Sequence, residues 1–87
     1  MLYYFYVLTS SDKPDDIRYV GVTTAKLNQR LSGHRYNAHH ENKRSQPVHK
    51  WMWKKYQEGF DIIMKQIDCC EKDMWEVTEK KWVKYYR

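Results

Sequence analysis

Arg30 and His34 lie four residues apart in the segment RYVGVTTAKLNQRLSGHR, which spans residues 18–35. Residues at this spacing share one face of a helix. Arginine is well suited to bind phosphate, because its planar guanidinium stays charged and donates two parallel hydrogen bonds. The pair could therefore act on a phosphate ester, although most pairs of this kind are solvated surface.

Glu79 is a second residue whose position could carry chemistry. It lies four residues after Trp75 and three before Trp82, on the apolar stripe of an expected helix. A carboxylate between two tryptophans is costly to desolvate unless something pairs with it. Two interpretations remain open: Glu79 is bonded to a nearby arginine or backbone amide, or it is a ligand of a divalent cation, which prefers carboxylate oxygen.

Two strands are expected at the N-terminus, over residues 2–9 and 18–23, and the turn sequence SSDKPDD predicts that they form an antiparallel hairpin. The first run is apolar or aromatic at both parities, which favours a central strand covered on both faces. Gly21 in the second run predicts the close approach of another group. Tyr6 and Tyr19 lie on these neighbouring strands and carry no chemical argument by themselves, since core tyrosines are common.

The rest of the chain predicts three helices and one further strand. We expect helices over 27–38, 47–58 and 73–86, the first capped by Thr24 or its neighbour, and a third strand over 60–67. The order ββααβα predicts a small sheet with helices packed on it. The expected fold is therefore α/β (α+β), in a single domain over residues 1–87.

Positive charge is concentrated in the middle third of the chain. Residues 24–57 hold eight basic residues and one acid, net +7, whereas the whole chain carries +5. Such a segment indicates a surface that binds a polyanion such as nucleic acid. Besides Arg30, the candidate nucleic-acid-binding residues are Lys26, Arg35, Lys43, Arg44, Lys50, Lys54 and Lys55.

The remaining composition bears on the compartment. No stretch reaches the roughly 20 apolar residues of a membrane span, and the N-terminal LYYFYVL lacks the features of a signal peptide. Cys69 and Cys70 are adjacent, which predicts two reduced thiols, since a disulfide between neighbours is strained. We therefore expect an intracellular, cytoplasmic protein with no membrane association.

Taken together, the motifs resemble those of the GIY-YIG nucleases. YFY at 4–6 followed by YVG at 19–21 resembles the paired strand signature of that family. The arginine of LNQR, the histidine four residues later and the glutamate of EKKWVKYY fall where the family has them. MWKKYQEGFDI, residues 52–62, is similar to the usual lead-in to the third strand, and the resemblance covers about residues 4–86.

The resemblance implies a three-stranded antiparallel sheet flanked by helices, and hydrolysis of phosphodiester bonds in DNA with one divalent metal, Mg²⁺ or Mn²⁺. Glu79 would hold the metal, and Arg30 would bind the scissile phosphate and stabilise its developing charge. Tyr6 would be the general base or its relay, and Tyr19 would orient the attacking water or the phosphate. His34 would hydrogen-bond a tyrosine and help to deprotonate it. Which tyrosine is the base remains open.

The chain departs from the family pattern in three ways. YFY lacks the leading glycine and the middle isoleucine of the first motif, and the asparagine that many relatives carry beyond the last helix has no counterpart. We also expect no separate DNA-binding region of the kind that most relatives attach. We therefore expect a monomer or weak dimer whose targeting is supplied by a partner protein or an additional DNA-binding subunit.

Two other functions are consistent with parts of this sequence. A non-catalytic basic nucleic-acid-binding module needs only the basic segment and its aromatic residues, but it has no use for Glu79 beside Tyr6, Tyr19 and Arg30. A zinc protein would use the two cysteines with His34, His39 and His40, at a spacing that matches no usual zinc pattern.

Overall fold

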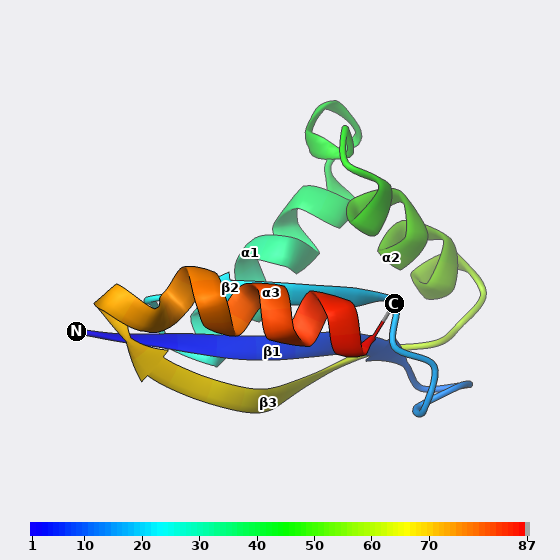
Figure 1. Ribbon diagram of the computed structural model, residues 1–87. Helices are drawn as coiled ribbons and strands as arrows, with labels where there is room; N and C mark the ends of the chain where they lie inside the picture. The colour runs from blue at the N-terminus through cyan, green and yellow to red at the C-terminus, as the bar shows by residue number, and fades with distance from the viewer. Residues whose placement is uncertain (87) are drawn as a thin grey trace.

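A three-stranded antiparallel sheet lies between two layers of helices in the computed structural model, which describes residues 1–86 (Figure 1). The elements follow in the order β1 (Leu2–Ser10), β2 (Tyr19–Thr23), α1 (Leu27–His39), α2 (Pro47–Gln57), β3 (Ile62–Glu71) and α3 (Trp75–Tyr85). Short 3₁₀ turns precede α2 and α3, at Glu41–Lys43 and Lys72–Met74. The predicted order ββααβα and the α+β fold are confirmed. No helix within residues 1–86 is long and apolar enough to cross a membrane.

Three expected boundaries were wrong. The third strand begins at Ile62 because Gly59, with φ of 90°, ends the α2 turn. It continues to Glu71 because its second half pairs with the start of β1, where Leu2 lies opposite Glu71. Met74 is part of a 3₁₀ turn, so the last helix begins later than expected. The expected cap at Thr24 is also absent: α1 starts after Lys26 with no side-chain cap.

β1 is the central strand, as predicted, in a sheet of order β2-β1-β3. Phe5, Tyr6, Val7 and Leu8 expose at most 2 % of their surface. Successive residues of a strand point to opposite faces, so this run requires cover on both sides. The two helical layers in Figure 1 supply it.

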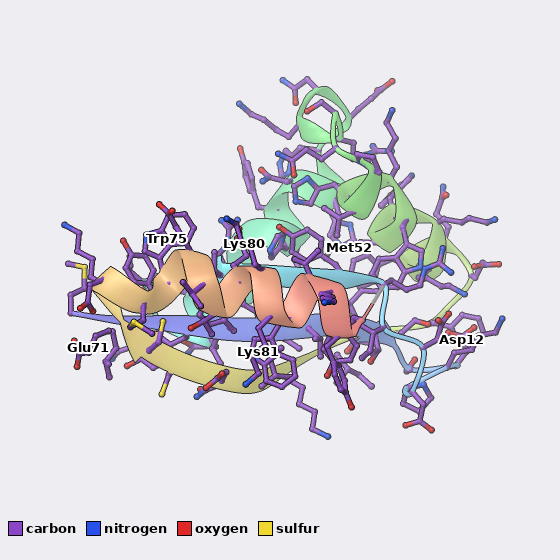
Figure 2. The ribbon with its side chains drawn as sticks, viewed as in Figure 1. Asp12, Met52, Glu71, Trp75, Lys80 and Lys81 are labelled. Atoms are coloured by element: carbon purple, nitrogen blue, oxygen red, sulfur yellow. The ribbon has the colours of Figure 1, made fainter. Side chains whose placement is uncertain are left out.

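The two faces of the sheet pack against different helices. Tyr6 and Leu8 belong to the main core, together with Ala38 of α1 and Val48 and Met52 of α2. Met52 is fully buried, and Figure 2 places it between α2 and the sheet.

The opposite face packs against α3. The ring of Tyr3 stacks on Trp75 with centroids 5.7 Å apart, and the indole N–H of Trp82 donates to Asp68 of β3 at 2.9 Å. These contacts hold α3 along the sheet, as Figure 1 shows.

Tyr6 is positioned by a bulge in the pairing with β3 on one side and by a glycine of β2 on the other. A bulge shifts the β1–β3 register between Phe5 and Tyr6, so that Phe5 lies opposite Asp68 but Tyr6 lies opposite Gln66. On the other side, Tyr6 pairs with Gly21 of β2. A Cβ atom on Gly21 would collide with the ring and hydroxyl of Tyr6 and would lie 2.7 Å from the ring of Tyr19. The close approach predicted at Gly21 is therefore confirmed, and the group that approaches is Tyr6.

We predict that Gly21→Ala destabilises the protein, because the added methyl must push aside a fully buried tyrosine. Overpacking of this kind costs about 1–3 kcal/mol, or a fall of at least about 4 °C in melting temperature for a domain of this size. Gly33→Ala is the matched control, since a Cβ there meets nothing within 4 Å and alanine is favoured in a helix. Thermal unfolding of the two variants should move in opposite directions; an unchanged melting temperature for Gly21→Ala would contradict the packing argument.

Candidate active site

The hydroxyl of Tyr6 is the meeting point of the residues that the sequence singled out. Nε of Arg30 donates to this oxygen at 3.2 Å, and Nε2 of His34 is hydrogen-bonded to it at 2.8 Å. Arg30 and His34 lie one turn apart on α1, which confirms that they share a face. The two tyrosines pack near each other as well, with the ring centroids of Tyr6 and Tyr19 6.2 Å apart.

His34 lies in the core of the domain. It is 1 % exposed, whereas Leu27 and Leu31 on the same helix are only partly buried. Both ring nitrogens of His34 have partners, because Nδ1 is hydrogen-bonded at 3.0 Å to Nε2 of His49. Two hydrogen bonds offset the desolvation of a neutral imidazole, which explains how this polar ring can be buried.

His49 is the residue of this cluster that the sequence analysis did not single out. It lies near the start of α2, it is 4 % exposed, and its ring centroid is 5.2 Å from that of His34. It is buried with Val48 and Met52 on the core side of the helix. That spacing was the available signal, since a histidine three residues before a core methionine lies on the same face.

Tyr19 connects the cluster to the surface. Its ring meets the edge of His34 at a centroid distance of 5.5 Å. It also lines a cavity of about 450 Å³ together with Arg18 and with residues at the start of α2, among them Gln46 and Trp51. Tyr19 therefore contacts His34 of the cluster and also lines a cavity at the surface.

The environment keeps the phenol and the imidazole neutral. Burial raises the pKa of Tyr6, an effect that the hydrogen bond and charge of Arg30 oppose. Burial, together with the charges of Arg30 and His49, lowers the pKa of His34 to about 4. At neutral pH the ring of His34 is thus uncharged and has a lone pair to accept a proton. The hydrogen bond to Tyr6 raises the pKa of Arg30, so its guanidinium stays charged.

Glu79 is half-buried on α3 and is not enclosed between the tryptophans as the sequence suggested. Within residues 1–86 it forms no ion pair and no side-chain hydrogen bond, so the expected partner, Arg30 or a backbone amide, is not found. The physical reason is that Trp75 and Trp82 are themselves only half-buried, which leaves water access to the carboxylate. Its predicted role as a metal ligand stays a prediction.

Glu79 nevertheless lies on the part of α3 next to the Tyr19 side of the sheet. It lines a surface cavity with Val83, one turn further along α3, and Val83 lines a second cavity with Tyr19. Lys80 and Lys81, which follow Glu79, are exposed, as expected, and Figure 2 shows them on opposite sides of the helix.

The candidate nucleic-acid-binding residues divide into two groups. Two form ion pairs inside the fold: Arg35 with Asp61 at 3.4 Å, and Lys55 with Asp12 at 3.0 Å. The others are free of ion pairs in the part of the chain that the structure describes. Arg44 lies over the ring of Trp53 at 4.4 Å, and the exposed members are Lys26, Lys43, Lys50 and Lys54.

Comparison with known proteins gives one match. Neither a curated protein nor a solved structure matches the chain significantly. The GIY-YIG catalytic domain family matches residues 2–87, which is nearly the whole sequence. Of the residues that carried the resemblance, Tyr6, Tyr19, Arg30 and His34 lie in one cluster, whereas Glu79 lies apart from them on α3. The chain therefore belongs to the GIY-YIG catalytic domain family, whose fold is of the nuclease type.

Proposed function

We propose that this protein is an endonuclease that hydrolyses phosphodiester bonds in DNA with the help of one divalent cation, Mg²⁺ or Mn²⁺. The observation that supports it most is the chain of hydrogen bonds from Arg30 through Tyr6 to His34. A cation, a phenol and a neutral imidazole in contact form a system that can bind an anionic ester and remove a proton from a nucleophile.

Arg30 has two tasks in this proposal. Its Nε atom donates to Tyr6, while the side chain as a whole is exposed, so the other guanidinium nitrogens are available to a phosphate. A phosphate bound there lies beside the hydroxyl of Tyr6. Arg30 then stabilises the charge that develops on the phosphoryl oxygens and also the negative charge on Tyr6 if its proton leaves.

Tyr6 is the group that passes on the proton of the attacking water. A free phenol has a pKa of about 10, and burial raises the pKa of Tyr6 further, so it is a weak base without help. His34 supplies the help, because its neutral Nε2 lies 2.8 Å from the phenol oxygen. As the phenol proton moves to His34, Tyr6 can take the proton of the water. Tyr19, half-buried at the edge of the cluster, orients the water or the phosphate.

A divalent metal would be held by Glu79. No group of three or more His, Cys, Asp or Glu side chains that could hold a metal exists within residues 1–86. The single carboxylate fits Mg²⁺ all the same, since this ion usually keeps several waters and binds through one or two carboxylates plus substrate phosphates. When bound, the metal supplies positive charge to the phosphate and to the leaving oxygen.

The DNA partner is proposed from charge. The exposed members of the basic group lie just before α1, on α2 and on the connection between the two helices, close in sequence to the catalytic candidates. Arg44 over Trp53 adds a cation on an aromatic face, a combination typical of nucleic-acid binding. Targeting by a partner protein and a monomeric or weakly dimeric state remain part of the proposal.

The experiment that tests the function is a nicking assay on plasmid DNA, with Mg²⁺ or with EDTA, using the parental protein and Arg30→Ala. We expect Mg²⁺-dependent nicking by the parental protein and a loss of about 100-fold or more in Arg30→Ala, as for removal of one donor to transition-state charge. Binding to DNA should weaken far less. Arg30→Lys should not restore cleavage, because a point charge lacks the guanidinium fork. If the lysine variant cuts at nearly the parental rate, Arg30 contributes only its positive charge, and the guanidinium fork is not required.

The metal role of Glu79 is tested by Glu79→Gln, which keeps size and removes charge. We expect a folded protein that still binds DNA and has lost Mg²⁺-dependent cleavage by orders of magnitude. Its melting temperature should be nearly unchanged, since Glu79 is half-exposed and forms no ion pair in the described chain. Glu76→Gln, an exposed glutamate on the same helix, is the matched control. A Glu79→Gln protein that melts earlier yet still cuts would exclude the metal role.

Electrostatic binding is tested by the salt dependence of DNA affinity. Lys50 and Lys54 lie one turn apart on α2 and are both exposed. If each contacts a phosphate, their replacement by glutamine lowers the slope of log affinity against log salt by about 0.9 per contact. Lys81→Gln on α3 should leave the slope unchanged. Equal slopes for all of these proteins would show that α2 does not contact the backbone.

A further inference from the structure

We infer that His49 is the final proton acceptor of the site: it acts through His34 and takes up the charge that the removal of the water proton creates. The inference rests on the proposed hydrolytic function. It concerns the second of two buried histidines whose rings are hydrogen-bonded to each other, Nδ1 of His34 to Nε2 of His49 at 3.0 Å.

The hydrogen bonds form one continuous chain from the surface to α2. Arg30 is a donor only, so the phenol oxygen of Tyr6 accepts from it. When Tyr6 donates its own proton to Nε2 of His34, the proton of that neutral ring is on Nδ1. Nδ1–H then donates to Nε2 of His49, whose remaining proton is on its own Nδ1. Each of these two hydrogen bonds is therefore donated in the direction from Tyr6 to His49.

This order permits a balanced transfer of protons. The attacking water gives a proton to the oxygen of Tyr6, as the phenol proton moves to Nε2 of His34. The proton on Nδ1 of His34 moves to Nε2 of His49 in the same direction. Tyr6 and His34 end neutral and His49 ends as an imidazolium. The hydroxide equivalent adds to phosphorus as the bond from phosphorus to the leaving sugar oxygen breaks, and that oxygen takes a proton from solvent water. No oxidant or further reactant is required.

The charged surroundings favour His49 over His34 as the place for the positive charge. Besides His49, three groups face His34: the Arg30 guanidinium, one turn earlier on α1, and the rings of Tyr6 and Tyr19. Within residues 1–86 the hydrogen bond of His49 to this network is the one to His34. Burial and the charge of Arg30 lower the pKa of both histidines. Arg30 lies on the same helix face as His34 and is hydrogen-bonded to the Tyr6 hydroxyl that His34 contacts, so its charge acts more directly on His34 than on His49. A proton that reaches the pair is therefore held on His49.

The geometry of His49 fits a titrating group better than a packing residue. Its Nδ1 atom is buried and has no hydrogen-bond partner within residues 1–86. An unsatisfied buried polar atom costs about 1–3 kcal/mol, which an apolar side chain of similar size would avoid. Nε2 of His49 can accept the hydrogen bond from Nδ1 of His34 and can also bind the proton that is transferred.

The test is the pH profile of cleavage at saturating DNA and Mg²⁺. His49→Gln offers His34 an oxygen that accepts a hydrogen bond but cannot take a proton. We expect the rate on the plateau to fall by about tenfold or more. The acidic limb should move to lower pH, because the remaining imidazole, that of His34, lies nearer to the positive charge of Arg30. His40→Gln is the control: it makes the same change at an exposed histidine whose Nδ1 lies 2.7 Å from the carbonyl oxygen of Tyr36.

A structural role would lower the rate of His49→Gln by one factor at every pH and leave the acidic limb in place, and that result would overturn the inference. That result would leave the proposed nuclease function standing. The proposed function itself fails if the parental protein shows no Mg²⁺-dependent cleavage. Nitrogen NMR of the parental protein decides the matter even if the variant does not fold. Both rings should carry the proton on Nδ1, and His49 should protonate before His34 on acidification. A proton on Nε2 of His34, or the reverse order, would overturn the inference.

Discussion

The hydrogen bond between the hydroxyl of Tyr6 and Nε2 of His34 is the interaction on which the site depends. It joins the central strand to α1 across the main core, with both residues almost completely shielded from water. In such surroundings a hydrogen bond is strong, and a missing partner is costly. The bond therefore fixes the position of Tyr6, the rotamer of His34 and, through the other ring nitrogen, the position of His49 on α2. Packing and the proposed proton transfer use the same contact.

The sheet is shaped to make that contact. Tyr6 is a large residue on the central strand, which has β2 on one side and β3 on the other. Its ring needs space above one of these two strands. Gly21 provides the space on β2, and the bulge after Phe5 changes the register on β3 at the same position. Bulges bend a strand locally and redirect its side chains. The family signature that the sequence carries as YFY and YVG thus has a steric explanation. Gly21 of the second motif leaves room for the ring of Tyr6 in the first motif.

The sequence allowed the fold to be predicted well, because its patterns are local. β1 is apolar on both parities, and Pro47 and Gly59 mark the ends of α2, so element order and the central strand follow. It also indicated that Arg30 and His34 share a face. The depth of His34 could not be predicted, because it depends on His49, which is fifteen residues away in sequence and adjacent only after α1 and α2 have packed. Likewise the tryptophans around Glu79 suggested burial, but α3 is the single helix on its face of the sheet and leaves them half-exposed.

The two parts of the proposed chemistry come from opposite layers of the sandwich. The proton-transfer residues lie between the sheet and the α1–α2 layer, whereas Glu79 belongs to α3, which packs on the other face. Tyr19 on β2 is the residue that borders both sides, since it touches His34 and also lines a cavity with Val83 of α3. β2 is an edge strand of five residues, so nothing in the sheet separates its outer side from a ligand. A phosphate and its metal bound along this edge would meet Arg30 from one layer and Glu79 from the other, and the substrate itself would complete the site.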